Sequence, residues 1–465
     1  MKIQNVLLIL FFAVVFSTRG LYAEEAAEEA VGMAEAVETA EEAAGLSRER
    51  VRELALGHSR SLARYDLAVR SSVLDERGQE FSNLPSLSLG GSASVNLWDS
   101  GGAPVTTGDS FGAGMNVGLS QSLFNGGKSV IYRQISALNT GAARKDALAE
   151  YFRVLDTADT AYYGVLEAAA NLEAAEASLQ TAEISLSMAE TRFQNRMIRE
   201  GEYLEALAEK ESKESARNQA RRDLNLSKVQ LKNLTNLREL PALTGIDFSY
   251  YDHLIRRLSE LNDGDVAAIY DVLWKQAAAN NPGLSKSALA SQNAENNLSL
   301  AKRDYTPTLG ASFSTGLNYS PQNGLEFSSG RLSISGNIPL DFWVTANNVA
   351  KRQAARDQAG LDYLDAESSL AFDLQSALLD AVSQAGQVLS ARRACEYAEK
   401  HFEYSMELYR LSQNSVSDLS AASALVSGNR VQLIRSQYSF LRGLSALRSL
   451  GAFGSEAEME AILGG

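Results

Sequence analysis

The chain has almost none of the residues that build disulfide frameworks or metal sites. Its 465 residues include one cysteine and three histidines. A single cysteine, Cys395, excludes an internal disulfide framework. The histidines, His58, His253 and His401, are scattered without the spacing of metal ligands, so we expect surface or packing roles for them. The sequence therefore predicts no metal and no cofactor.

Long apolar runs are absent beyond the N-terminus. Residues 1–23 combine Lys2, an apolar run and the cleavage site Leu21-Tyr22-Ala23, which predicts a signal peptide and a mature chain that starts at Glu24. No later stretch approaches the roughly 18 uninterrupted apolar residues of a membrane-spanning helix. Any membrane crossing by the mature chain must therefore use strands.

Basic residues are too few to suggest a polyanionic partner. The formal net charge is −14, and removal of Lys2 and Arg19 with the signal moves it from −14 to −16. We expect no nucleic-acid partner, because such binding depends on neutralising phosphates. Residues 24–44 hold eight glutamates and no base. We interpret residues 24–46 as a solvated acidic tail.

Charged side chains are also missing from three internal stretches, residues 85–98, 111–127 and 305–325. Apolar residues alternate there with Ser, Gly or Asn, so a strand built from them has one oily face and one small polar face. Each such strand is followed or preceded by a partner with the same alternation. The pattern predicts four strands per chain, arranged as two hairpins at 85–124 and 307–340.

The lack of charge favours a membrane hairpin over an ordinary soluble sheet with one face on a core. Thirteen residues at about 3.3 Å each, tilted by about 40°, rise roughly 33 Å, which is enough to cross the hydrocarbon of a bilayer. Aromatic residues that suit a bilayer interface gather near the strand ends. They include Trp98, Phe124, Tyr319 and Trp343.

A very long heptad-patterned helix follows each hairpin. Apolar residues step by four and three from Tyr151 to Leu172, and by seven from Leu374 through Cys395 to Tyr409. A helix from about 128 to 192 would be close to 100 Å long. Sustained heptads imply left-handed coiled pairs, in which Cys395 is a packing residue. After short breaks at 194–201 and 410–417, a second helix returns in each half.

The two halves of the chain repeat one plan. A shift of 216 residues maps Val388 onto Leu172 and Tyr409 onto Phe193. Shorter helices, about 47–81 and 266–303, lead into the hairpins. The mature chain then divides into a first repeat at 47–236, a mid-barrel insertion at 237–265, a second repeat at 266–451 and a C-terminal tail at 452–465.

Four strands do not close a membrane barrel, because the smallest membrane barrels use about eight. Open sheet edges are not tolerated in lipid. Two chains would give eight strands and a plugged centre, whereas three chains would give twelve strands and an open one. The small inward-facing Ser, Gly and Asn residues favour three chains. We therefore expect a mainly α protein with a membrane β part that is completed only in a trimer.

Short motifs recur in order in both halves of the chain. They are Pro85-Ser-Leu and Pro307-Thr-Leu, Gln121-Ser-Leu-Phe-Asn-Gly-Gly and Asn337-Ile-Pro-Leu-Asp, Asn280-Asn-Pro, Arg192-Phe193 and Leu408-Tyr409. None is specific alone, but their duplicated order and spacing are. In this pattern the chain resembles the TolC-like outer-membrane efflux proteins, from about residue 47 to 451.

The resemblance implies a homotrimer whose 12-stranded β-barrel in the outer membrane continues as a coiled-coil α-barrel across the periplasm. It implies a passive exit duct of a tripartite efflux or type I secretion system. Such a duct is surrounded by outer-membrane lipid and joined to a periplasmic adaptor protein and an inner-membrane transporter.

The resemblance also places the inner end of the tunnel at the two helical breaks. Asp418 occupies the position of an acidic residue that lines a constriction in the family, whereas a second acidic position is Ala421 here. The alternative is that Asp418 stabilises the start of the returning helix, with Ser417 as its cap, and both roles can hold. Contact with the adaptor would fall on Arg196, Met197, Ile198, Ser415 and Val416.

A phosphate-binding loop, an enzyme and a structural stalk are the alternatives to a duct. Gly126-Gly127-Lys128-Ser129 looks like the tail of a phosphate-binding loop, but Ser122 stands where that motif needs a glycine, so a strand-to-helix turn explains it better. No nucleophile, base and orienting group form a set, and we expect no enzyme. The alternative function is a structural or adhesive coiled-coil stalk anchored in the outer membrane.

Overall fold

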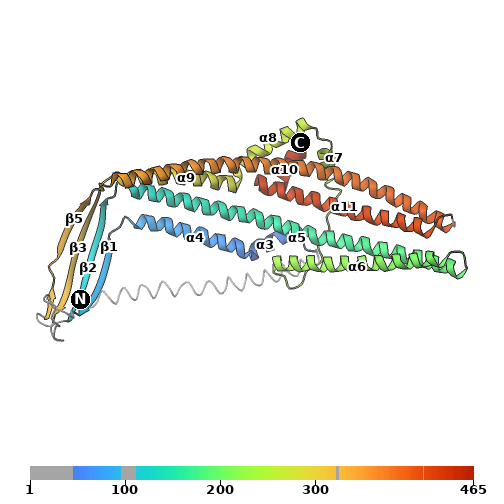
Figure 1. Cartoon of the computed structure of the whole chain (residues 1–465), viewed down its shortest axis with the longest axis horizontal. Helices are drawn as coiled ribbons and strands as arrows, with labels where there is room; N and C mark the ends of the chain where they lie inside the picture. The colour runs from blue at the N-terminus through green and yellow to red at the C-terminus, as the bar shows by residue number, and fades with distance from the viewer. Residues whose placement is uncertain (1–44, 96–110, 321–323, 412, 465) are drawn as a thin grey trace.

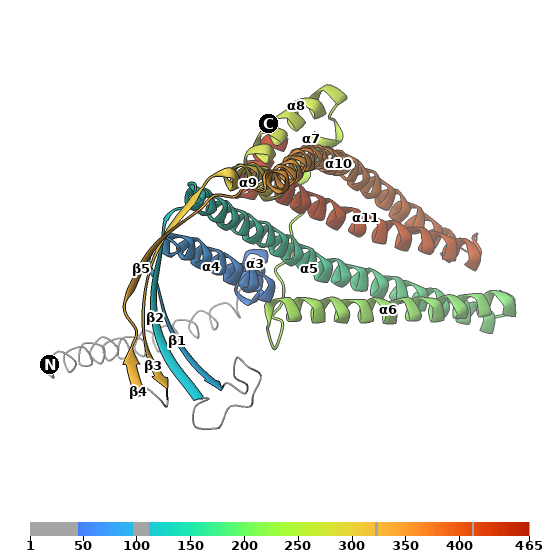
Figure 2. The ribbon, with the colours of Figure 1, turned by 60° about the vertical axis from the view of Figure 1, so that its left-hand side comes forward.

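The molecule is long and has its sheet at one end (Figure 1). The computed structural model describes residues 45–95, 111–320, 324–411 and 413–464. From the sheet, α4 (Arg60–Phe81), α5 (Lys128–Gln194), α9 (Pro282–Lys302) and α10 (Phe342–Arg410) run side by side, and α5 and α10 continue to the far end of the molecule (Figure 1). Turning the molecule shows that the sheet curls, and that α7 (Asp252–Ser259), α8 (Asp263–Asn280) and the C-terminus lie together near the middle of α10 (Figure 2).

One antiparallel sheet contains all the strands of the described residues, with β2 and β3 at its centre. Both strands of the second half that follow β3 pair with β3, so each lies on its outer side. The strands are β1 (Ser86–Val95), β2 (Phe111–Phe124), β3 (Thr308–Ser320), β4 (Gly324–Phe327) and β5 (Arg331–Asn337).

The prediction of four strands per chain is corrected to five strand segments in four positions. β4 pairs with Leu317–Ser320 and β5 with Thr308–Ser314, so the two together flank the length of β3. Between them the ladder is interrupted, and Ser328 satisfies Gly316 with its backbone N–H at 2.9 Å. The outer strand of the second hairpin is therefore interrupted between Phe327 and Arg331.

The helices account for most of the chain. Two of them, α5 and α10, have 67 and 69 residues, so each is roughly 100 Å long at about 1.5 Å per residue. The full set is α3 (Arg48–His58), α4 (Arg60–Phe81), α5 (Lys128–Gln194), α6 (Glu200–Thr235), α7 (Asp252–Ser259), α8 (Asp263–Asn280), α9 (Pro282–Lys302), the 3₁₀ turn η1 (Arg303–Tyr305), α10 (Phe342–Arg410), α11 (Val416–Gly451) and α12 (Glu456–Gly464).

The helix that precedes each hairpin is divided into two, whereas the sequence predicted one continuous helix at about 47–81 and another at about 266–303. The first breaks at Ser59, whose side chain accepts a hydrogen bond from the backbone of Leu62, and the second at Asn281, which accepts one from Leu284. These side chains cap a new helix, and Pro282 at its first turn has no N–H to continue the preceding one.

The helices near the sheet keep the order of the strands. α4 lies beside α5, α5 beside α9, and α9 beside α10. Farther from the sheet α6 pairs with α5, and α11 lies between α5 and α10. The heptad positions of α10 are buried along this wall, among them Leu374, Ala381 and Val388. Among the described residues, no helix combines the length and apolar character needed to cross a membrane.

A buried charged cluster holds the middle of the molecule together. Asp159 of α5 is fully buried, and both its carboxylate oxygens accept from Arg52 of α3, at 2.5 and 2.6 Å. Ser445 of α11 donates to the same carboxylate at 2.9 Å. Because the penalty for burying a charge is offset only by close partners, these residues must fold together.

The cluster extends to the C-terminal segment, which forms α12. Glu456 accepts from Arg48 at 2.7 Å, from Arg448 at 3.0 Å and from Arg52. Burial would raise the pKa of Glu456, but the positive charges of Arg48 and Arg52 outweigh it and hold that pKa below its ordinary value. Met459 and Leu463 bury the apolar side of α12.

We expect Glu456→Gln to loosen α12, because the variant keeps the shape but loses the charge that faces three arginines. The loss should be roughly 1–3 kcal/mol of local stability. A depressed carboxyl pKa stabilises the fold above its unfolded value of about 4.3 and ceases to do so as the pH falls through the folded value. Hydrogen exchange of 456–464 should therefore differ between wild type and variant at pH 7 and converge in acid.

Glu458→Gln on the exposed side of the same helix is the matched control and should leave exchange unchanged. Equal effects from the two variants would contradict this role for the charged cluster.

Candidate functional site

The sheet has a continuous apolar face that the rest of the chain leaves uncovered. Leu89 of β1 pairs with Val117 of β2, and Leu119 pairs with Phe313 of β3, so their side chains share one face. Leu89 is 70% exposed, and Leu332 and Ile334 of β5 are exposed on the same face. An exposed apolar surface of this extent marks a contact with lipid or with another protein.

The opposite face of the sheet carries small polar residues. Ser86 and Ser120 share a hydrogen bond of 2.6 Å across β1 and β2. Gly118 of β2 is the cross-strand partner of Ser88, and a Cβ on Gly118 would come within 2.8 Å of the Ser88 hydroxyl oxygen. The small residues thus leave room for their neighbours' polar side chains. The side chains on this face are short and hydrophilic.

The aromatic residues predicted at the bilayer interface lie at two levels. Phe124 and Trp343 stand where the sheet meets the helices, and Trp343 is 73% exposed. Tyr319 stands at the far end of β3. Phe124 pairs with Leu309, and ten residues of strand at about 3.3 Å each separate Leu309 from Tyr319, or roughly 25 Å of height after a tilt of about 40°. Trp98 lies outside the described residues.

A tight turn at Gly126 and Gly127, here called the elbow, joins β2 to α5. Gly126 and Gly127 have φ of +71° and +76°, a left-handed conformation that other residues avoid. A Cβ on Gly126 would collide with Thr306. Arg303 donates to the Gly126 carbonyl at 2.7 Å. Lys128, the lysine of the loop that resembles a phosphate-binding motif, is paired with Asp304 at 2.7 Å, in keeping with the strand-to-helix turn.

The first helical break, between Gln194 and Glu200, ends α5 with a residue in an unusual conformation. Arg196 has φ of +56°. The backbone N–H of Met197 donates to Arg192 at 2.8 Å and that of Arg196 to Phe193 at 2.9 Å. This is the helix ending that glycine usually occupies. Arginine adopts it here although the left-handed conformation costs a non-glycine residue about 1–2 kcal/mol.

Asp418 forms a capping box with Ser415 at the start of α11, the helix that follows the second break. Its Oδ2 accepts from the Ser415 backbone at 3.1 Å and from the Ser415 hydroxyl at 2.6 Å, and the Asp418 backbone N–H donates to the Ser415 hydroxyl at 3.1 Å. The cap is therefore Ser415, and the expectation of Ser417 was wrong by two residues, because α11 begins at Val416. These hydrogen bonds lower the pKa of Asp418, whose carboxylate remains exposed.

The two tips share a small core of their own, built from Ala189, Ala206, Tyr409, Val416 and Leu419. Val416 is 3% exposed and Ile198 packs against the same core, whereas Arg196, Met197 and Ser415 are exposed. Of the five residues suggested for adaptor contact, three therefore lie on the surface of the chain and two hold the tip together.

A contact between Arg192 and Tyr409 joins the two tips and is not evident in the sequence. The guanidinium of Arg192 lies 4.0 Å from the centre of the Tyr409 ring and donates to the Tyr409 carbonyl. Both residues stood in recurring motifs, but nothing in the sequence shows that they meet.

The described residues include no group of three or more metal-ligating side chains placed to hold a metal. Burial raises the pKa of Cys395, which packs in the helical seam.

Comparison with known proteins identifies the family. The sequence matches the outer membrane efflux protein family over residues 51–237 and 273–452. The chain belongs to this family. The resemblance to TolC-like proteins is thereby confirmed, and this efflux protein resides in the outer membrane and extends into the periplasm. No protein of curated function matches its sequence.

Solved structures of low sequence identity share its fold. CusC, described in connection with transmembrane channel formation, is 16% identical with a TM-score of 0.73 over 87% of this chain and 91% of CusC. VceC, an outer membrane protein of Vibrio cholerae, is 16% identical with a TM-score of 0.69 over 87% and 96%. The CmeC outer membrane channel of Campylobacter jejuni is 18% identical with a TM-score of 0.69 over 90% and 89%.

We expect Leu89→Lys to impair assembly in the outer membrane, whereas Ser88→Lys should be tolerated. The two residues are neighbours on β1 and differ chiefly in the face that they occupy. A lysine on a lipid-facing position near the bilayer middle costs about 2–4 kcal/mol, and one on the water-facing side much less. The measurement is the amount of assembled protein in outer membranes, counted as oligomer that stays intact when it is heated in detergent. Similar losses for both variants would argue against lipid on the apolar face.

We also expect Arg196→Gly to stabilise the end of α5 by about 1 kcal/mol, because glycine adopts a positive φ freely. Hydrogen exchange in the last turn of α5 should slow. Asn195→Gly is the control, since Asn195 has an ordinary φ of −81° and the change should speed exchange there. Slower exchange in both variants would refute the strained ending.

Proposed function

We propose that this efflux protein is a passive exit duct that works as a homotrimer. The observation that carries the proposal is the sheet, which has an exposed apolar face, a small polar face and two open edges at β1 and β5. Such a sheet is incomplete in a bilayer, because lipid offers no hydrogen bonds to the backbone groups of an edge.

Three copies satisfy those edges and produce an open channel. Each chain supplies four strand positions, so three chains form a twelve-stranded barrel with the apolar face toward lipid and the Ser, Gly and Asn face toward water. A barrel of about eight strands is filled by its own side chains, whereas larger ones hold an aqueous lumen. The helices of roughly 100 Å then continue the lumen through the periplasm.

The family is one of efflux proteins, and a structure that shares the fold is an outer membrane channel. We therefore assign the duct to a tripartite efflux or type I secretion system with an inner-membrane transporter. A periplasmic adaptor would contact the helical tips, where Arg196, Met197 and Ser415 are exposed. Ile198 and Val416 support that surface from inside.

The constriction would lie at Asp418. In a trimer, three copies of this carboxylate surround the tunnel axis and attract cations while repelling one another. Capping and gating are compatible, because the bonds to Ser415 leave the carboxylate charged and exposed.

The experiment is conductance in planar bilayers with purified oligomers. Wild-type protein should conduct, and Asp418→Asn should lower cation selectivity, because it removes three negative charges at the constriction. Ser415→Ala is the matched control, since it weakens the cap but keeps the charge. It should preserve selectivity.

Silent bilayers would refute the duct and support the coiled-coil stalk. Equal changes in the two variants would assign Asp418 to capping alone.

A further inference from the structure

The two halves of the chain correspond residue by residue near the sheet. A shift of 222 residues carries the cap Ser59 onto the cap Asn281, the start of α4 onto the start of α9, and the start of β1 onto that of β3. A shift of 216 residues carries the end of α5 onto the end of α10 and both ends of α6 onto those of α11. Helices α4 and α9 are thus equivalents, as are α5 and α10.

These equivalents differ in how many neighbours they have. α9 lies between α5 and α10 and has four buried residues. α4 lies against α5 on one side and has no buried residue. The side of α4 that faces away from α5 carries a heptad row of exposed apolar residues, Leu67, Leu74 and Phe81. A helix that is equivalent to a doubly flanked one therefore lacks its second neighbour.

The junction between α5 and α9 shows what such a neighbour looks like. Lys286 of α9 forms an ion pair with Asp146 of α5 at 2.7 Å. Leu289 packs over Gly141, where a Cβ would lie 3.3 Å from its side chain. Asn293 donates to Asn139 at 2.7 Å. The two helices run antiparallel along this contact.

The shifts convert this junction into a contact between two copies of the chain. Lys286 becomes Arg64 and Leu289 becomes Leu67, both on α4. Asp146 becomes Asp362 and Gly141 becomes Asp357, both on α10. The positive and negative members of the ion pair keep their signs, although Arg64 and Asp362 are exposed in one chain.

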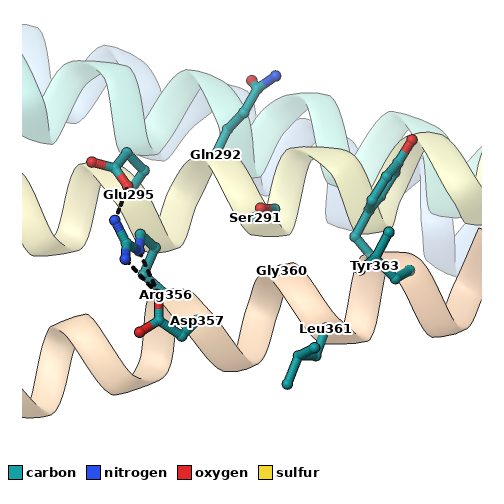
Figure 3. A pocket seen from close by; sticks show the side chains of 9 residues that line it. Ser291, Gln292, Glu295, Arg356, Asp357, Gly360, Leu361 and Tyr363 are labelled. Atoms are coloured by element: carbon teal, nitrogen blue, oxygen red, sulfur yellow. Dashed lines mark hydrogen bonds and ion pairs between the residues drawn. The ribbon is translucent and has the colours of Figure 1, made fainter.

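The surface of α10 at this place is open and carries exposed apolar side chains. Asp357, Gly360, Leu361 and Leu364 follow one another at helical spacing and line the α10 side of a groove of about 700 Å³, whose other side is formed by Ser291, Gln292 and Glu295 of α9. Figure 3 shows Arg356 turned to Glu295 of α9, whereas Leu361 points away from α9. Leu361 is 63% exposed, as is Leu67 on α4.

Charge also matches along the two helices. Between Arg356 and Arg392, α10 carries six acidic residues and no basic one: Asp357, Asp362, Asp365, Glu367, Asp373 and Asp380. The half of α4 that would lie opposite carries Arg60, Arg64 and Arg70 with only Asp66. Opposite charges across a contact fix its register and exclude wrong partners.

We infer that the row of Asp357, Leu361 and Leu364 on α10 binds α4 of a second copy of this chain, with Arg64 paired to Asp362 and Leu67 packed against the row. The inference rests on the proposed oligomer and names its contact. Because the two surfaces differ, the contact is head-to-tail and repeats around a ring until it closes.

Cross-linking tests the contact. In a Cys395→Ala background, the full-length chain with Arg64→Cys and Asp362→Cys is extracted in detergent and treated with a short bis-maleimide. We expect covalent dimers and trimers on denaturing gels. Lys286→Cys with Asp146→Cys should cross-link within one chain, so that the protein still migrates as a monomer on the denaturing gel. Arg64→Cys with Asp373→Cys, displaced by about 16 Å at about 1.5 Å per residue, should give none.

The outcomes separate this inference from the proposed function. If light scattering shows a monomer, the trimeric duct itself fails. If the oligomer is intact but the Arg64 and Asp362 cysteines cross-link no better than the displaced pair, the duct stands and the contact is refuted.

A charge swap decides the matter should the cysteine variant fail to assemble. Arg64→Asp and Asp362→Arg should each lower the temperature at which the oligomer dissociates, and the combined variant should restore it. Loss without restoration would refute the ion pair.

Discussion

The hydrogen-bonding groups at the two edges of the sheet impose the constraint on which the whole molecule depends. Water can satisfy an open edge, but lipid cannot. In the proposed duct the exposed apolar face of the sheet contacts lipid, and β1 and β5 pair with strands of other copies of the chain. The helices near the sheet follow the same arrangement, because α4, α5, α9 and α10 stand in the same order as the strands.

The long helices extend this arrangement and end in a compact structure of their own. A separate small core at the tips, joined by the contact of Arg192 with Tyr409, holds the two helical pairs together at the far end. The middle is fixed by the charges around Asp159, which tie α3, α5 and α11. Between these two points the seam is lined by alanine and other small residues that let helices approach closely.

Local periodicity made much of this predictable from the sequence. The alternation of Leu89 with Ser88 determines the faces of β1, and the heptads of α10 determine its buried side, because both patterns depend on near neighbours. Arg52 with Asp159 and Arg192 with Tyr409 were not predictable, since each pair is separated by more than a hundred residues and any arginine could serve. The choice of Ser415 over Ser417 as cap depended on where the helix begins, which composition does not determine.

The elbow at Gly126 and Gly127 has a mechanical consequence. It is held by Arg303, Thr306 and the pair of Lys128 with Asp304, and it carries a helix of 67 residues. Over a lever of about 100 Å, a rotation of only about 5° at the elbow would displace the tips by roughly 9 Å. The geometry of this short turn therefore sets the direction of a helix whose far end lies about 100 Å away, and small changes in the turn are magnified there.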